Sequence, residues 1–202
     1  MIKITDISKK ISSDFVLNID NLVLEDSTNY ILRGKNGSGK TTFIKIVMGL
    51  LSKDSGKIEI KGTVCGFMGT THMIDFLTPR EYFFVAGKSN GLKKSQVIER
   101  YNYINSFFNR KYFDESEKIA DYSDGNRQLI GLIACCVTYA SFIFLDEPFN
   151  FLDDDTQKSF INLINDLNAK QNISFIYSDN MHKDSILNCK TLLIQDGTVN
   201  LG

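Results

Sequence analysis

The sequence has 202 residues, of which 43% are hydrophobic. A chain of this size can bury a full core, and we expect residues 1–202 to form a single compact domain. Its 23 Lys and Arg residues nearly balance its 24 Asp and Glu residues, and the formal net charge is -1. This balance excludes a polybasic field for nucleic acid or for an anionic bilayer, so we expect no nucleic-acid partner.

Short runs of β-forming residues make up much of the first third of the sequence. The segment Thr41–Leu51 follows a glycine-rich loop and is apolar on all sides, which is typical of a helix packed under a sheet. Strands are predicted at Ile2–Ile7, Phe15–Ile19, Leu22–Leu24, Asn29–Leu32, Lys57–Lys61 and Val64–Phe67.

The middle of the chain begins with a helix-start pattern. Thr78 offers an N-cap hydroxyl, Pro79 fits the first helical turn, and Glu81 completes a capping box. The stretch from about 78 to 128 is therefore predicted to be a mostly helical insert. Apolar residues at helical spacing continue this pattern at Val97, Tyr101, Ile104 and Phe108.

The stretch Leu129–Leu145 carries no charge and approaches the roughly 20 residues needed to span a bilayer. Polar residues in its middle favour a buried helix followed by a buried strand, Ser141–Leu145. Strands that alternate with helices then predict an α/β fold with a parallel sheet and no second domain. The later elements are an amphipathic helix marked by Phe160, Leu163, Ile164 and Leu167, a strand at Ile173–Tyr177, and a last strand at Thr191–Ile194 that turns at Asp196 and Gly197.

The four cysteines lack the paired spacing of a zinc site, and we interpret them as free thiols. Residues Met1–Asp6 alternate between charged and apolar side chains in the manner of a strand, unlike a signal peptide, so we expect a cytoplasmic chain. The cysteines are Cys65, Cys135, Cys136 and Cys189.

A phosphate-binding loop is predicted where the strand Asn29–Leu32 meets the helix Thr41–Leu51. The residues fit the pattern G-x-x-x-x-G-K-[ST], in which main-chain N–H groups and the helix N-terminus surround phosphate oxygens. Lys40 would reach the β and γ phosphates of ATP, and the Thr41 hydroxyl would bind Mg²⁺. The loop consists of Gly34, Lys35, Asn36, Gly37, Ser38, Gly39, Lys40 and Thr41.

Two carboxylates follow the apolar strand Phe142–Leu145, at the sheet edge where open α/β folds bind ligands. Asp146 is predicted to hold the magnesium shell. Glu147 would face the γ phosphate and act as the general base for the attacking water.

Three segments together resemble the ABC ATPase family: Gly34–Thr42, Phe142–Pro148, and Tyr122–Gln128 between them. They are similar to the family's Walker A, Walker B and LSGGQ signature sequences. Ser123 and Gly125 match the signature, while Tyr122, Asp124 and Asn126 depart from it. Ser123 also fits an N-cap of a helix that is predicted to begin near Asn126.

The resemblance implies a P-loop NTPase fold of ABC type, with antiparallel N-terminal strands, and ATP and Mg²⁺ as cofactors. It also implies a head-to-tail dimer, homo- or heteromeric, in which Ser123 and Gly125 act on the partner's ATP. Thr42 belongs to the Walker A segment, and Phe15 is the best candidate for stacking on adenine. The expected partners are integral membrane transporter subunits that hold the chain at the cytoplasmic face of the inner or plasma membrane.

Two positions depart from the family pattern. Thr70 stands where the family usually has a glutamine, and Asp179 stands where a histidine usually faces the γ phosphate. His182 could substitute, although a surface histidine is the simpler interpretation. The sequence therefore predicts an ATP-hydrolysing transporter subunit with slow turnover; an ATP-binding clamp with little turnover and a non-transport ABC protein remain as alternatives.

Overall fold

The computed structural model describes residues 1–13, 15–109, 112, 116–179 and 185–202. Within these residues nine strands form one sheet, in the order β4-β1-β2-β9-β8-β3-β7-β6-β5. The strands are β1 (Ile2–Lys10), β2 (Val16–Leu24), β3 (Asn29–Arg33), β4 (Ser55–Ile60), β5 (Val64–Phe67), β6 (Phe142–Leu145), β7 (Ser174–Ser178), β8 (Cys189–Gln195) and β9 (Thr198–Leu201). The helices are α1 (Lys40–Val47), α2 (Pro79–Ser89), α3 (Lys94–Asn105), α4 (Asp124–Val137) and α5 (Asp154–Gln171), with 3₁₀ turns η1 (Thr70–His72) and η2 (Ile119–Asp121).

The sheet combines a parallel core with antiparallel strands at one side. Strand β3 pairs in parallel with β7 and β8, and β6 pairs in parallel with β5 and β7. Strand β1 pairs antiparallel with β2 and β4. The predicted fold class, a mostly parallel sheet with antiparallel N-terminal strands and a helical insert, is confirmed.

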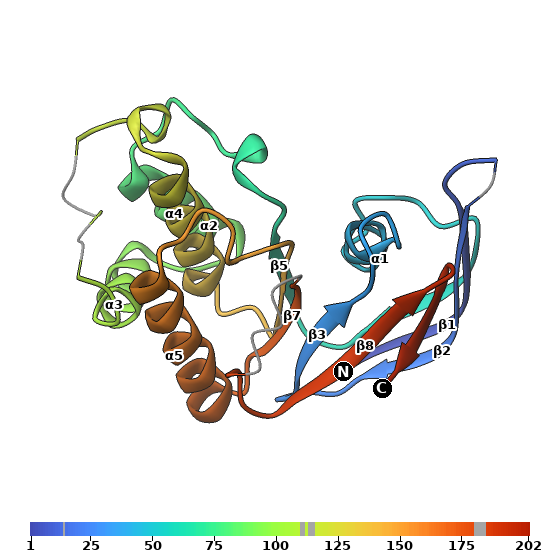
Figure 1. The fold of residues 1–202 in the computed structure, drawn as a ribbon. Helices are drawn as coiled ribbons and strands as arrows, with labels where there is room; N and C mark the ends of the chain where they lie inside the picture. The colour runs from blue at the N-terminus through green and yellow to red at the C-terminus, as the bar shows by residue number, and fades with distance from the viewer. Residues whose placement is uncertain (14, 110–111, 113–115, 180–184) are drawn as a thin grey trace.

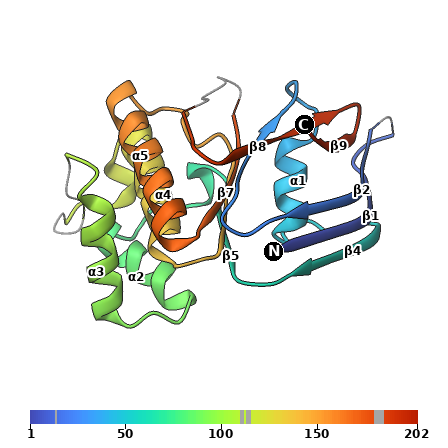
Figure 2. The ribbon, with the colours of Figure 1, turned by 90° about the horizontal axis from the view of Figure 1, so that it is seen from below.

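Two apolar cores lie on the two faces of this sheet. Helix α1 packs on one face, where its apolar side chains meet those of β1 and β2. Helices α2 to α5 gather on the other face (Figures 1 and 2). Strand β6 contributes to both cores, because Phe142 and Phe144 point to the α1 side and Ile143 and Leu145 to the opposite side. Burial on both faces explains why this strand is apolar throughout.

One prediction for the N-terminal strands is wrong. The predicted strands Phe15–Ile19 and Leu22–Leu24 belong to the single strand β2, which begins at Val16, and the polar residues Asp20 and Asn21 lie within it. The pairing of β1 with β2 steps over Asp6, which has a φ of 51°, so the polar pair sits beside an irregularity of the ladder. Hydrogen bonds with β1 keep Asp20 and Asn21 in the strand, although these residue types favour a turn.

The C-terminal strand prediction also needs correction. The turn at Asp196 and Gly197, with φ values of 48° and 76°, leads into a further strand, β9, so β8 is not the last strand. Strand β9 pairs antiparallel with β8 and meets β2 at the residue pair Asn18 and Thr198. Its four residues are too few to show a periodic pattern.

Helix α1 is shorter than the predicted segment Thr41–Leu51. It ends at Val47, and Gly49 follows with a φ of 74°. A left-handed glycine directly after the last turn is a common helix terminator. The apolar residues Leu50 and Leu51 therefore lie outside the helix.

The helical insert is confirmed, beginning with α2. The Thr78 hydroxyl accepts a hydrogen bond from the Glu81 main-chain N–H at 3.3 Å, and Glu81 accepts one from the Thr78 N–H at 2.8 Å. This is the predicted capping box. Helix α3 buries the periodic residues Val97, Tyr101 and Ile104, but it ends before Phe108.

The uncharged stretch Leu129–Leu145 divides as predicted into the end of α4 and the strand β6. Both halves are almost entirely buried. Among the described residues, no helix has both the length and the hydropathy to cross a membrane. None of the four cysteines, all of which lie within the described residues, forms a disulfide.

A buried arginine joins three parts of the helical layer. Arg100 on α3 is 2% exposed, and burial lowers the pKa of its guanidinium. Its Nε donates to the Cys136 carbonyl oxygen near the end of α4 at 3.0 Å, and a second nitrogen donates to Gln171 at the end of α5. The guanidinium carbon lies 4.1 Å from the centroid of the Tyr139 ring. The cation thus stabilises the negative ends of two helices.

Replacing Arg100 by alanine is expected to lower the free energy of unfolding by about 2–4 kcal/mol, because one buried acceptor, one partly buried acceptor and one ring contact lose their partner. Urea denaturation followed by circular dichroism measures this change. The matched control is Arg80→Ala, because Arg80 is exposed and lies 5.8 Å from the Phe84 ring. An equal loss in both variants would contradict the assigned role of Arg100.

Candidate functional site

The loop between β3 and α1 depends on glycine at three positions. Gly37 and Gly39 have φ values of 80° and 106°, in the left-handed region that other residues rarely adopt. A Cβ atom at Gly34 would lie 2.4 Å from the Ile194 carbonyl oxygen, so close approach of β8 requires glycine there. The predicted sequence of strand, tight loop and helix is confirmed.

The loop holds a lysine and a serine in positions suited to an anion. Lys40 is 7% exposed, and its Nζ donates to the carbonyl oxygens of Gly34 at 2.8 Å and Lys35 at 3.2 Å. The Ser38 hydroxyl is buried and has no hydrogen-bond partner among the described residues. Because a buried donor without a partner is costly, this hydroxyl fits a site completed by a bound anion such as phosphate.

A cavity of about 260 Å³ lies over the loop and contains most of the predicted binding residues. Phe15 forms part of its wall, and it also lines an adjoining cavity of about 630 Å³ formed with Gly34, Lys35 and Ser38. We call the first the phosphate-loop cavity; its lining residues are Ile11, Phe15, Asn36, Gly37, Gly39, Lys40, Thr41, Thr42 and Glu147.

The two predicted magnesium ligands meet at this cavity. The Thr41 hydroxyl, in the first turn of α1, donates to Asp146 Oδ2 at 2.7 Å, and Asp146 directly follows β6. A hydroxyl and a carboxylate are oxygen donors of the kind that Mg²⁺ binds together with phosphate oxygens and water. The donor set therefore fits magnesium.

The predicted base, Glu147, sits in an unusual backbone conformation. Its φ of 48° lies in the left-handed region. Its main-chain N–H donates to the Ser178 hydroxyl at 2.8 Å, and its carbonyl oxygen accepts from Gln128 Nε2 at 3.2 Å. Its carboxylate accepts from Asn150 Nδ2 at 2.6 Å. Strained backbone of this type is common at functional sites.

Ser123 caps helix α4, as predicted, but the helix begins at Asp124 and not near Asn126. The Ser123 hydroxyl accepts from the Asn126 side-chain amide at 2.9 Å, and Tyr112 donates to the carbonyl oxygen of that amide at 2.8 Å. Asn126 departs from the signature sequence, yet it connects the signature serine to a buried tyrosine. These contacts hold Ser123 in place.

Gly125 packs against the loop that follows β6. A Cβ atom at this position would lie 2.5 Å from the Phe151 carbonyl oxygen, which explains the glycine. Asp153 at the end of that loop caps α5, and hydrogen bonds from Thr156 lower the pKa of the Asp153 carboxyl. Ser123, Gly125 and Phe151 line a separate cavity of about 810 Å³, which we call the signature cavity.

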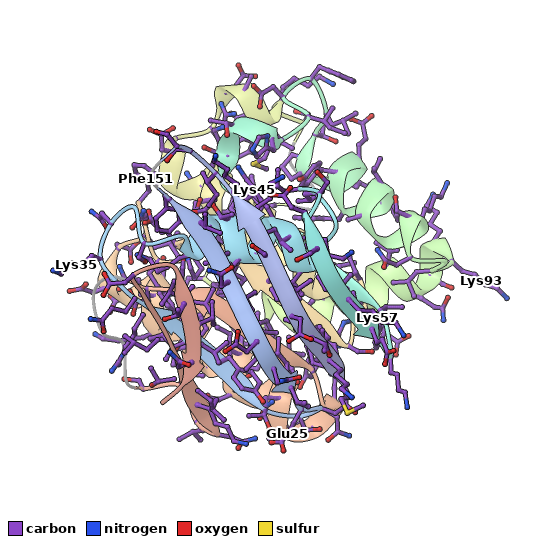
Figure 3. All side chains as sticks on the ribbon, turned by 90° about the vertical axis from the view of Figure 1, so that its right-hand side faces the viewer. Glu25, Lys35, Lys45, Lys57, Lys93 and Phe151 are labelled. Carbon is purple, nitrogen blue, oxygen red and sulfur yellow. The ribbon has the colours of Figure 1, made fainter. Side chains whose placement is uncertain are left out.

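The structure thus brings one group of predicted residues together and keeps a second group apart. Phe15, Thr42, Glu147 and five of the eight loop residues line the phosphate-loop cavity, and Asp146 is hydrogen-bonded to Thr41 at its edge. The other three loop residues, Gly34, Lys35 and Ser38, line the adjoining cavity. Ser123 and Gly125 lie in the signature cavity. Phe151, 67% exposed, and Lys35 appear at the same edge of the molecule in Figure 3.

A family model described as "ABC transporter" matches residues 17–150, which is most of the chain and includes all three motifs. The chain belongs to the ABC transporter family. The resemblance of its phosphate loop, carboxylate pair and signature segment to this family is therefore confirmed.

Curated ABC relatives are ATP-binding proteins of transport systems. The chain is 27% identical to the bacitracin transport ATP-binding protein BcrA of Bacillus licheniformis, over 90% of this chain and 62% of that protein. It is 31% identical to the zinc import ATP-binding protein ZnuC of Ehrlichia ruminantium, over 78% of this chain and 65% of that protein. The chain thus spans less than two thirds of the length of these relatives.

Solved structures support the ABC ATPase fold. A dimeric ATP-binding cassette in a post-hydrolysis state, bound to ADP and phosphate, superposes with a TM-score of 0.83. The match covers 99% of this chain and 97% of the cassette at 16% sequence identity. At this identity the likeness shows the fold alone.

The two departures from the ABC pattern lie near the site. Thr70 is in η1, and its carbonyl oxygen accepts from Arg127 on α4 at 3.5 Å. Asp179 follows β7 and is 5% exposed. Burial raises the pKa of the Tyr177 phenol; the charge of Asp179 acts in the same direction and that of Arg33 opposes it. His182 lies outside the described residues.

Sequence reasoning missed several residues that support the site. Ser178 and Asn150 contact the two carboxylate residues, and Gln128 contacts the Glu147 carbonyl oxygen. Ser178 directly follows the predicted strand Ile173–Tyr177, and a polar residue at that edge of a parallel sheet is a signal that could have pointed to it. Ile11 directly follows β1 and gave no such signal, because its side chain is apolar.

Proposed function

We propose that the chain binds ATP with magnesium and hydrolyses it as the ATPase subunit of an ABC transporter, and that residues 1–202 act as one nucleotide-binding domain. The observation that carries this proposal is the 2.7 Å contact between the Thr41 hydroxyl and Asp146 beside the phosphate loop. It supports a magnesium site next to a nest of main-chain donors, as nucleotide hydrolysis requires.

Different residues in and beside the phosphate-loop cavity bind the phosphates, the magnesium ion and the adenine. The main-chain N–H groups of Gly34–Thr42 surround the phosphates, and Lys40 exchanges the two carbonyl contacts of its ammonium for phosphate oxygens. Thr41 and Asp146 would hold Mg²⁺, and the ion would neutralise charge on the phosphate oxygens. Phe15 stacks on adenine.

Glu147 performs the chemical step as general base. It takes a proton from the water that attacks the γ phosphate, and a base of this kind contributes about 10²- to 10⁴-fold to the rate. Asn150 contacts its carboxylate, and Ser178 and Gln128 contact its main chain. The two main-chain contacts, from Ser178 and Gln128, preserve the left-handed backbone conformation that places the Glu147 carboxylate at the cavity.

ATP joins two ATPase domains head to tail. In one chain Ser123 and Gly125 are in the signature cavity and not in the phosphate-loop cavity, which supports their action on the ATP of a partner. Asn126 donates its side-chain amide and, at 3.5 Å, its main-chain N–H to the Ser123 oxygen. These bonds occupy the acceptor sites of the hydroxyl and leave its proton for an incoming phosphate.

Changing Asn126 to aspartate is expected to prevent the ATP-dependent dimer without weakening ATP binding by the monomer. The new carboxylate would accept the Ser123 proton and repel the incoming phosphate. Light scattering at saturating Mg-ATP in a Glu147→Gln background measures the dimer, and calorimetry measures the binding.

The matched control is Asn109→Asp. Asn109 is exposed and lines the same signature cavity, so this change adds the same charge there without touching Ser123. Dimerisation should persist in this control. Equal loss in both variants would show that the added charge alone opposes the dimer.

The partners that we propose are integral membrane transporter subunits, which would hold the chain at the cytoplasmic face of the inner or plasma membrane. The names of the relatives, which include transport and import proteins, support this assignment. Purification from detergent extracts tests it: an intact protein that carries no integral membrane partner would contradict it.

The second candidate function is an ATP-binding clamp that dimerises with little turnover. The buried residue Asp179 favours the clamp function. It stands in place of the family's usual histidine, and a negative charge near the γ phosphate would oppose ATP hydrolysis. Phosphate release by the purified protein, measured beside calorimetric Mg-ATP binding, separates the two functions. Binding without release supports the clamp, and no binding overturns both.

A further inference from the structure

One hydroxyl contacts both residues of the carboxylate pair. Ser178 ends β7 and is fully buried. Its hydroxyl donates to Asp146 Oδ1 at 2.7 Å and accepts from the Glu147 main-chain N–H at 2.8 Å. A hydroxyl has one proton and two acceptor sites, so the direction of both bonds is set.

The first bond fixes the plane of the Asp146 carboxylate. Its other oxygen, Oδ2, accepts from the Thr41 hydroxyl at 2.7 Å. The terminal torsion of an aspartate is broad by itself, so a carboxylate bonded on one oxygen alone can rotate. Bonds on both oxygens, from α1 and β7, hold one orientation and leave a further lone pair on each oxygen for magnesium or its bound water.

The second bond holds the backbone turn at Glu147. The φ of 48° at this residue is unfavourable for a side chain with a Cβ, and surrounding contacts must maintain it. Ser178 anchors the N–H of Glu147, and Gln128 anchors its carbonyl oxygen at 3.2 Å. Without Ser178, one side of this turn loses its anchor, and the N–H is left without its buried acceptor.

We propose that Ser178 is a positioning residue that couples the orientation of the magnesium-binding carboxylate to that of the general base. This inference rests on the proposed function. Ser178 contacts no nucleotide itself; it acts through Asp146 and Glu147. Removing its hydroxyl should therefore weaken the contribution of Mg²⁺ to ATP binding and slow turnover, while metal-free ATP binding remains.

The same strand offers a matched control. Ser174 begins β7 and is also fully buried. Its hydroxyl accepts from the Thr28 main-chain N–H at 3.2 Å and donates to the Glu25 carbonyl oxygen at 3.4 Å, at the end of the strand away from the site. Ser174→Ala therefore removes a buried hydroxyl of the same strand without touching either carboxylate residue.

The experiment measures ATP binding by calorimetry in Mg²⁺ and in EDTA, together with kcat and KM, for the wild type and three variants. Ser178→Ala should bind ATP about tenfold more weakly in Mg²⁺ and equally well in EDTA, and kcat should fall more than KM changes. Ser178→Thr, which keeps the hydroxyl, should restore the magnesium effect. Ser174→Ala should lower the melting temperature without changing the magnesium effect.

The inference is overturned if Ser178→Ala keeps the wild-type magnesium effect and kcat. It is also overturned if Ser174→Ala loses the magnesium effect equally, because the role of the hydroxyl would then be structural. A folded Ser178→Thr variant that behaves like Ser178→Ala contradicts it as well. A wild-type protein that takes up no Mg-ATP would instead overturn the proposed function, so the two failures are distinguishable.

Discussion

Glutamine in place of Glu147 is expected to reduce phosphate release by about 10²- to 10⁴-fold, because an amide cannot accept a proton from the attacking water. The change is nearly isosteric, and the main-chain bonds of Glu147 to Ser178 and Gln128 do not depend on the side chain. Binding of Mg-ATP should therefore remain. In the proposed cycle hydrolysis releases the partner domain, so the variant should accumulate as an ATP-dependent dimer.

Steady-state phosphate release and light scattering at saturating Mg-ATP measure these two effects. Val85→Ala is a suitable control for general damage, since Val85 is an exposed residue on α2, away from both cavities. A Glu147→Gln variant with wild-type release would remove Glu147 from the reaction. A monomer at saturating nucleotide would contradict the trapped dimer.

Alanine in place of Lys40 is expected to weaken ATP binding by about 10- to 100-fold, the equivalent of one charge-assisted hydrogen bond or slightly more. The ammonium lies inside the loop, within 2.8 Å of the Gly34 carbonyl oxygen, and has little side-chain freedom to lose when phosphate binds. Calorimetry in Mg²⁺ and in EDTA should show the loss in both conditions, because Lys40 acts on the phosphates directly.

Lys45→Ala is the matched control for this change. Lys45 lies on the same helix, α1, in its last turn, and it lines a different cavity. Both variants remove one positive charge from α1, so a purely long-range electrostatic effect would weaken ATP binding equally in Lys45→Ala and Lys40→Ala. Comparable affinities for the wild type and Lys40→Ala would contradict a phosphate contact by Lys40.

The contacts within each motif were predictable from local sequence. The loop pattern at Gly34–Thr41, the capping box at Thr78 and the N-cap at Ser123 depend on residues within a few positions of one another. Backbone sterics and helix-end hydrogen bonding act over these short separations. The carboxylate pair was found for a similar reason, because an apolar parallel strand must end at the sheet edge where ligands bind.

The errors in the strand predictions lie where long-range pairing decides local structure. Strand β2 continues through Asp20 and Asn21 because it pairs with β1, and β9 exists because it pairs with β8 and β2. Neither strand has a sufficient pattern of its own. Pairing with a neighbouring strand supplies the hydrogen bonds that local composition does not require.

By itself the sequence determined the family, the phosphate loop, the end of β6 and the N-cap of α4, because each depends on residues within one short segment. Only the tertiary structure decided that Thr41 and Ser178, which are far apart in the sequence, both donate hydrogen bonds to the Asp146 carboxylate. Hydrogen bonds between side chains of separate elements depend on how strands and helices are placed in space. No pattern along the chain records that placement.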